Sequence, residues 1–236
     1  MAKPSIVRID TRELAPTQCT IGAFEVRLKA DRFRLMSPRD VDGYIEEKRD
    51  NGKPVSLVKG LHRYFVVDGH HTLCAIVGSS EPRELYLDLV ADFSGEDASG
   101  FWKQMRKAGF VLEQSLGAPV KPEDFPERLP DLVDDPFRSV AWLIRKMGAF
   151  EDLKKPYQEF AVADFLRERL SFRPVHDHEY ELVSLRAFEL MRSSEAKAYA
   201  EHEPRLGFVD EEPPDNLTKL YYEVLAKARA PRYYGR

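Results

Sequence analysis

Hydrophobic and polar residues alternate along several short segments in the first third of the chain, as they do in strands with one buried face. Strands are expected at residues 5–9, 23–29, 55–58 and 84–91, and also at 64–67, which is a continuous run of β-prone apolar residues. In the second segment, Phe24, Val26 and Leu28 alternate with charged residues. We therefore predict a small β-sheet built from the N-terminal part of the chain.

Two helices are expected to interrupt these strands. Ser37 is followed by a proline and, three residues later, by Asp40, which is the usual sequence of a helix start. Asn51 and a following glycine end this helix. A shorter helix is expected over residues 72–77, directly after the strand at 64–67.

From residue 92 onward, hydrophobic residues recur every three or four positions, which is typical of amphipathic helices. Helices are expected after Ser94 and Asp97, after Asp135, and over residues 158–170, 180–191 and 216–229. Residues 116–134 and 203–214 contain several prolines and are interpreted as connections. The predicted fold class is α+β, with a sheet domain at residues 1–92 and a helical region at 93–236 that covers or flanks it.

The composition places the chain among globular proteins and restricts its partners. It has 236 residues, 43% of them hydrophobic, and a formal net charge of −4. That charge argues against a broad nucleic-acid surface, because such surfaces neutralise phosphates with many Lys and Arg. Two cysteines are too few for a disulfide framework or a structural zinc site. No apolar run is long enough for a signal peptide or a membrane span, so we expect a soluble, cytoplasmic protein.

The segment Asp68-Gly69-His70-His71 is the most informative for chemistry, because it joins a predicted strand to a predicted helix. A helix N-terminus has unpaired N–H groups and a partial positive charge, and a glycine lets a ligand approach the backbone closely. The turn therefore fits an anion site beside one carboxylate and two imidazoles. Two alternatives stay open: Asp68 is an ordinary turn and capping residue, or one histidine is packed while the other is solvated.

This turn resembles the nucleotide-binding turn of the ParB/sulfiredoxin superfamily. Three further segments resemble the subgroup labelled ParB-like nucleases and occur in the same order as in that subgroup. One precedes the turn, at residues 16–22, and two come after it, at residues 101–105 and 134–139. The resemblance to the subgroup covers residues 10–172, whereas the superfamily resemblance covers about the first 90 residues. It implies a small ParB/sulfiredoxin-like mixed sheet followed by helices.

Members of the superfamily bind a nucleotide or phosphate at this turn, with different outcomes. Partition proteins hydrolyse CTP, sulfiredoxins phosphorylate a sulfinic acid with ATP, and free serine kinases transfer phosphate from ADP or ATP to serine. The kinases share the Asp-Gly-His-His turn but continue it with Arg, where this chain has Thr72. Sulfiredoxins have a cysteine at the position of His70, and the basic box of partition proteins is absent here.

The resemblance implies that Asp68 orients an acceptor or a metal ion, while Gly69 and the two histidines line the phosphate site. The expected catalytic residues are Asp68, His70 and His71, and the expected cofactor-binding residues are Gln18, Gly69, Thr72, Arg138 and Ser139. The implied cofactor is a nucleotide (ATP, ADP or CTP) with Mg²⁺, although no set of metal ligands is defined. For Arg138 an alternative is an ion pair with Asp134 or Glu159.

The leading hypothesis is a nucleotide-dependent phosphotransferase or nucleotide hydrolase that acts on an unidentified small-molecule acceptor. The first alternative is a non-catalytic nucleotide-binding or protein-interaction module, because Thr72 replaces a cation that faces phosphate in the kinases. The second is a metal-dependent nuclease, which the acidic net charge disfavours. His176 and His178 resemble a metal-binding tract, and their alternative is exposure to solvent on a polar loop.

Overall fold

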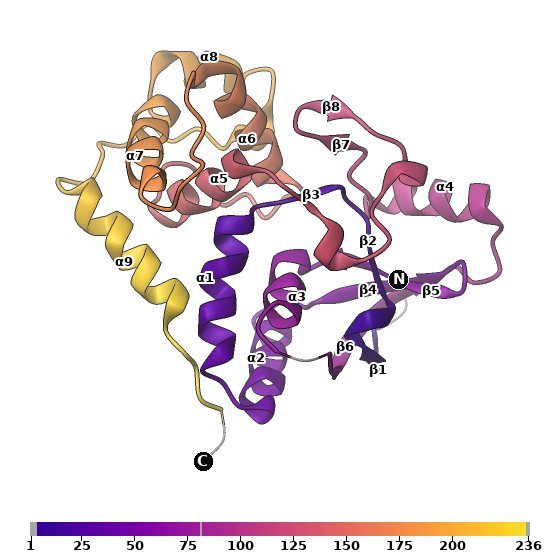
Figure 1. The fold of residues 1–236 in the computed structure, drawn as a ribbon. Helices are drawn as coiled ribbons and strands as arrows, with labels where there is room; N and C mark the ends of the chain where they lie inside the picture. The colour runs from indigo at the N-terminus through magenta and orange to yellow at the C-terminus, as the bar shows by residue number, and fades with distance from the viewer. Residues whose placement is uncertain (1–3, 81, 235–236) are drawn as a thin grey trace. The chain divides into compact units, whose positions relative to one another are not determined.

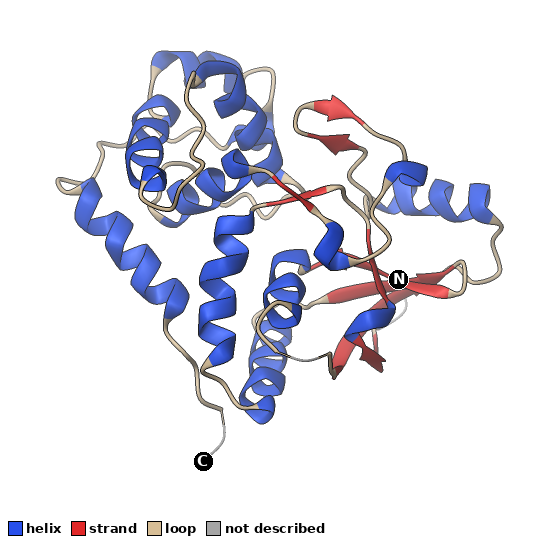
Figure 2. Cartoon of the chain, in the orientation of Figure 1, coloured by secondary structure: helices blue, strands red, loops and turns tan. Residues whose placement is uncertain are grey.

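A computed structural model describes residues 4–80 and 82–234 of the chain (Figures 1 and 2). The chain divides into two compact units. Unit 1 comprises Met1–Ile21, Val26–Val133 and Arg229–Arg236, and unit 2 comprises Gly22–Glu25 and Asp134–Ala228. Helices and strands are both present, which confirms the α+β class. Unit 1 continues to Val133, beyond the domain end predicted at residue 92.

Unit 1 contains a five-stranded mixed sheet in the order β1-β6-β4-β5-β2. These strands are β1 (Ser5–Asp10), β6 (Glu84–Asp92), β4 (Ser56–Gly60), β5 (Arg63–Asp68) and β2 (Leu14–Pro16). β4 runs antiparallel to β5 and parallel to β6, while β2 runs parallel to β5. Four of the predicted strands are thereby confirmed, and β2 is a strand that the sequence pattern does not predict.

The strand predicted at residues 23–29 is wrong, because this segment begins helix α1 (Ala23–Arg34). Phe24 and Leu28 are both about 1% exposed. Positions four residues apart lie on one face of a helix, and they also lie on one face of a strand. Two buried residues at this spacing therefore fit either period, and packing in the folded chain decides between the two structures.

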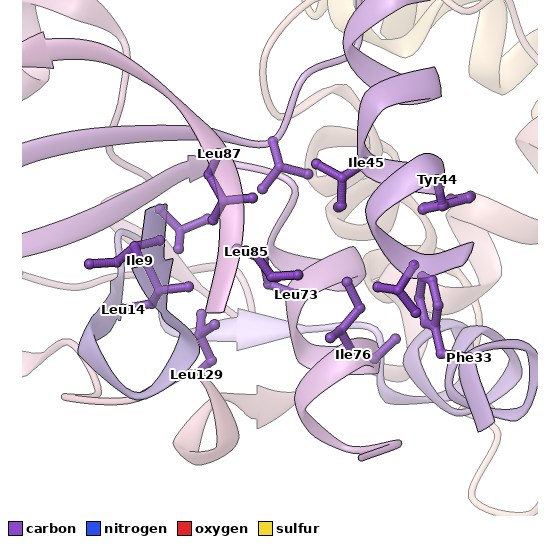
Figure 3. Close-up of a cluster of buried hydrophobic side chains, with 14 of the residues drawn as sticks. Ile9, Leu14, Phe33, Tyr44, Ile45, Leu73, Ile76, Leu85, Leu87 and Leu129 are labelled. Carbon is purple, nitrogen blue, oxygen red and sulfur yellow. The ribbon is translucent and has the colours of Figure 1, made fainter. Parts of the chain in front are cut away.

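Alternate residues of β5 enter two different cores on opposite faces of the sheet. Tyr64 and Val66 belong to the first cluster, which helices α1, α2 (Pro38–Asp50) and α3 (His70–Val77) complete. Figure 3 shows this cluster, with Phe33, Ile45 and Leu73 among its labelled side chains. Alternating side chains of a strand point to opposite faces, so β5 is buried on both sides. Its last residue is Asp68, at the start of the candidate turn.

The second cluster covers the other face of the sheet with helix α4 (Ala98–Ala108). The ring of Phe65 lies 4.8 Å from that of Phe101, centroid to centroid. Asp97 is the N-cap of α4 and accepts a hydrogen bond from Gly100 N at 2.7 Å. The helix predicted after Ser94 and Asp97 is therefore confirmed, but the capping residue is Asp97 rather than Ser94.

The predicted start of α2 at Ser37 is confirmed by a capping box. Asp40 N donates to Ser37 Oγ at 3.2 Å, and Ser37 N donates back to Asp40 Oδ2 at 3.2 Å.

We expect Ser37→Ala to lower the free energy of unfolding by about 1 kcal/mol, because a helix N–H loses its partner. Urea unfolding monitored by circular dichroism measures this loss. Ser94→Ala is the matched control, and an equal loss in both variants would contradict the assignment.

The connection predicted at residues 116–134 contains short elements. β7 (Gln114–Ser115) and β8 (Ala118–Pro119) form a hairpin, and 3₁₀ turns η2 (Pro122–Asp124) and η3 (Leu129–Asp131) follow. The connection ends in the short strand β9 (Val133–Asp134). Two further short elements lie earlier in the chain, the 3₁₀ turn η1 (Thr11–Glu13) and the strand β3 (Thr20–Ile21). Both cysteine thiols contact carbonyls of this segment, Cys19 at Asp124 and Cys74 at Leu129. The connection is thus ordered against unit 1.

Unit 2 is helical. Its elements are α5 (Pro136–Lys146), α6 (Gln158–Arg169), α7 (Glu179–Met191), α8 (Ser194–Ala200), η4 (Pro204–Leu206) and most of α9 (Leu217–Arg229). Four of these helices were predicted, and α8 was not. Phe24 stacks on Tyr180 in its core, with ring centroids 4.1 Å apart. Within the described residues, every helix is too short or too polar to cross a membrane.

Candidate functional site

The N-terminus of α3 is formed by a glycine in a left-handed conformation. Gly69 has φ +92° and is the N-cap of α3, and among the described residues no side chain caps this end. The first helical hydrogen bond runs from Leu73 N to Gly69 O, so the N–H groups of residues 70–72 precede it. A Cβ at position 69 would lie 3.0 Å from two side-chain carbons of Val55. Glycine is therefore required here, and the helix N-terminus is available to an anion.

His70 is buried and holds a neighbouring loop. Thr17 N donates to His70 Nε2 at 3.2 Å, so the ring carries its proton on Nδ1. Burial lowers the pKa of His70 to about 3, which makes the side chain neutral at pH 7. This geometry assigns His70 to positioning the Thr17 loop. The catalytic role of His70 stays a prediction.

The loop that contains Gln18 is fixed to the same turn. Thr17 Oγ1 donates to Val66 O at 2.7 Å, and Gln18 Nε2 donates to Thr20 O at 2.7 Å. Gln18 and Thr72 are 3% and 2% exposed, which leaves them little surface for contact with a ligand. The structure thus brings the predicted loop and turn together, although the Gln18 amide is used inside its own loop.

Lys48 interacts electrostatically with Asp68, Lys29 and Lys53, and sequence reasoning missed these lysines as site residues. Burial lowers the pKa of Lys48, a half-buried residue of α2; Asp68 opposes this shift, whereas Lys29 and Lys53 add to it. Lys29 also acts on the thiol of Cys74, in the first turns of α3. Lys48 and the two lysines that act on it bring positive charge to the part of unit 1 that contains Asp68. The sequence does contain one signal that could have identified Lys48 as a site residue, because a lysine on the apolar face of a predicted helix is unusual.

Asp68 lies at the exposed end of β5, opposite Ser56 of β4. His71 follows in the first turn of α3 and is 9% exposed. The polar groups at the turn are therefore the Asp68 carboxylate, the backbone N–H groups at the start of α3 and the ammonium of Lys48, which interacts with Asp68. This combination can hold an anion that carries several oxygens, such as a phosphate group.

Arg138 and Ser139 belong to unit 2, and their contacts are made within that unit. Arg138 is 5% exposed and forms ion pairs with Glu25 at 3.2 Å and with Glu159 at 2.9 Å. Ser139 is fully buried, and its Oγ accepts a long hydrogen bond from Glu25 N at 3.4 Å. The pairing with Glu159 matches the structural alternative for Arg138. The cofactor-binding role of both residues stays a prediction.

The remaining candidates contribute less to this chemistry. Burial raises the pKa of the Cys74 thiol to about 12 and also raises that of Cys19, which disfavours reactive thiolates. His176 and His178 stack, with ring centroids 5.7 Å apart. In the part of the chain that the structure describes, no group of three or more His, Cys, Asp or Glu residues is arranged to hold a metal ion.

Comparisons with known proteins agree with this fold. A family model described as "Putative ParB-like nuclease" matches residues 7–168, which is more than half of the chain. The chain belongs to this ParB-like nuclease family. The matched region includes the α3 turn and Lys48, and it confirms the resemblance expected for residues 10–172.

A solved structure of similar fold is the crystal structure of protein Atu1540 from Agrobacterium tumefaciens. It is 28% identical, covers 90% of this chain and 100% of its own, and superposes with a TM-score of 0.71. The similarity thus extends past the ParB-like family match and includes most of unit 2. A search of curated proteins gives no match.

Proposed function

We propose that the chain binds the phosphate groups of a nucleotide at the N-terminus of α3 and acts as a nucleotide-dependent phosphotransferase or nucleotide hydrolase. The observation that carries this proposal is the half-buried Lys48, which interacts with Asp68 and with Lys29 and Lys53, together with the N-terminus of α3 that no side chain of the described residues caps. Phosphoryl transfer depends mainly on cations and positioning. The lysines supply the positive charge that Thr72 does not.

The residues of the turn fit a nucleotide phosphate better than a preformed metal cage. Backbone N–H groups of α3 and the ammonium of Lys48 would hold phosphate oxygens. Asp68 would orient the acceptor or contribute one oxygen to Mg²⁺, which commonly takes one or two carboxylates together with phosphates and waters. The bound nucleotide (ATP, ADP or CTP) would supply the transferable phosphoryl group. The acceptor is a small molecule, or water in the case of hydrolysis.

Nucleotide binding is tested with a thermal-shift panel of ATP, ADP, CTP and GTP, each with and without Mg²⁺. A ligand at about 100 times its Kd stabilises a protein by about 2.7 kcal/mol, and in a chain of this size that raises Tm by about 5–10 °C. We expect Lys48→Met to weaken the binding about tenfold, because one charge-assisted contact is lost. Exposed Lys107 on α4 provides the matched control, Lys107→Met.

The contrary outcomes are clear. No shift of the wild type with any nucleotide would reject the proposal. Equal weakening by Lys48→Met and Lys107→Met would reduce the effect to net charge and reject the role of Lys48 at the site.

Turnover is tested separately, by phosphate release and by transfer to a panel of hydroxyl, amine and acid acceptors. We expect Asp68→Asn to keep nucleotide binding but to lower the rate about 10²-fold, as expected when a positioned acid or base is removed. Binding by the wild type without any turnover would favour the non-catalytic module.

A metal-dependent nuclease is a second candidate, which the description of the family favours. Phosphodiesters carry the same anionic oxygens, so the lysines and the helix N-terminus could contact a nucleic-acid backbone. The test is cleavage of plasmid and single-stranded DNA with Mg²⁺ or Mn²⁺. Cleavage that is lost in both Asp68→Asn and Lys48→Met would assign the turn to this reaction.

A further inference from the structure

The last described residues of the chain pack against helix α2 within unit 1. We call residues 230–234 the C-terminal strap. Tyr234 N donates to Asp40 Oδ1 at 2.8 Å, while the Tyr234 hydroxyl and the Arg232 guanidinium both bind the carboxylate of Glu47. The Arg232–Glu47 contact is 2.7 Å long. The strap is therefore attached to α2 at two points, seven residues apart along the helix.

Between these points, the strap occupies a space that exists because α2 contains a glycine. A Cβ at Gly43 would lie 2.4 Å from Tyr234 Cβ and 2.6 Å from Cγ, distances that real side chains do not adopt. Tyr234 also packs against the first core cluster, and its neighbour Tyr233 is 71% exposed. The fit is thus specific to one of two adjacent tyrosines.

The strap contacts the part of α2 that carries Lys48. Glu47, which binds both strap side chains, directly precedes Lys48. The Arg232 guanidinium lies 5.8 Å from the ring centroid of Tyr44, one helical turn before Lys48. Tyr44 is also among the groups that act electrostatically on Lys48. Strap, Tyr44 and Lys48 therefore form a continuous sequence of neighbours.

We propose that the C-terminal strap holds α2 and with it the half-buried Lys48, which makes Tyr234 and Arg232 positioning residues of the phosphate site. Neither residue is placed in contact with the ligand. Release of the strap frees the end of α2, and the Lys48 ammonium then becomes more hydrated and loses its fixed position. The effect on ligand affinity rests on the proposed function, whereas the effect on Lys48 does not.

Two variants release the strap in different ways. Tyr234→Ala removes the anchoring side chain, and Gly43→Ala fills its space while leaving the strap sequence intact. Alanine favours helix formation over glycine, so Gly43→Ala does not weaken α2 through helix propensity. Tyr233→Ala is the matched control, because it removes an adjacent, exposed tyrosine. Tyr234→Phe keeps the ring and removes only the hydroxyl, should Tyr234→Ala fail to fold.

The first measurement is the titration of Lys48 by NMR in protein labelled with ¹³C-lysine, with its signal assigned by its absence in Lys48→Met. We expect the pKa of Lys48 to rise toward its ordinary value in Tyr234→Ala and Gly43→Ala, because burial is what lowers it.

The second measurement is the affinity for ATP, ADP and CTP with Mg²⁺ by calorimetry. We expect binding about fivefold to tenfold weaker in the same two variants, and unchanged values in Tyr233→Ala.

An unchanged Lys48 titration in both strap variants would overturn the inference, and so would an equal change in Tyr233→Ala. If the wild type binds no nucleotide but Lys48 still shifts when the strap is released, the proposed function fails and the positioning role of the strap is supported. If the wild type binds nucleotide and the variants bind it equally well, the strap has no role at the site.

Discussion

Replacing Arg138 by methionine is expected to lower the free energy of unfolding by about 3–5 kcal/mol. Arg138 is buried between Glu25 and Glu159, and Glu25 is itself 2% exposed. Removing the guanidinium takes away the ion pair that Arg138 forms with a buried carboxylate in a medium of low polarity, and breaking such a pair costs far more than the pair itself contributes. Urea unfolding without added ligand measures the loss, because no cofactor is then present to contribute.

The matched control is Arg186→Met. Arg186 pairs with Glu189 on the surface of α7, where both side chains are more than half exposed. Exposed pairs of this kind contribute about 0–1 kcal/mol. A loss below about 1 kcal/mol for Arg138→Met would contradict the structural role and return Arg138 to the candidate cofactor ligands.

The stability of the protein is expected to fall as the pH decreases below about 6.5, in part through His70. Burial lowers the pKa of His70 to about 3 in the folded protein, against an ordinary value of 6.5. Between these two values the unfolded chain binds a proton that the folded chain does not, so acid favours unfolding. The stabilisation is fully present above pH 6.5 and is lost as the pH falls toward 3, by up to about 1.4 kcal/mol per pH unit.

Urea unfolding between pH 7 and pH 4.5 measures this dependence in the wild type and in His70→Gln. Glutamine can still accept the hydrogen bond from Thr17 N but does not titrate. We expect a flatter pH profile for His70→Gln and an unchanged one for His202→Gln, since His202 is exposed. Parallel profiles of the wild type and His70→Gln would show that His70 does not account for the acid sensitivity.

Most of the sheet could be predicted from sequence because its strands carry local signals. β5 contains a run of β-branched and aromatic residues, a short turn separates it from the apolar residues of β4, and Asp97 and Ser37 cap helices through their own neighbours. The segment that begins α1 could not be decided in this way. Phe24 and Leu28 satisfy the periods of a strand and of a helix equally, so packing determined the outcome.

The turn at Gly69 could also be predicted, whereas the charges around it could not. Asp68 and Gly69 are adjacent in sequence and define their own geometry. Lys29 belongs to α1 and Lys48 to α2, and only tertiary packing brings Lys48 close enough to Lys29 and Asp68 to interact with both. Arg138 shows the same limit, because its partner Glu25 is 113 residues away in the chain. Local sequence patterns contain no information on such pairings.

The chain passes between the two units four times, at residues 21–22, 25–26, 133–134 and 228–229. Neither unit is therefore an independent stretch of sequence that a deletion could isolate. A chain shortened to the family match, ending at residue 168, would lose the last residue of α6, all of α7 and the strap. Studies of the separate units would instead require newly joined chains, in which the short Gly22–Glu25 piece is connected to the long helical segment. For this fold, the sequence range of a family match and the range that forms a stable unit are different quantities.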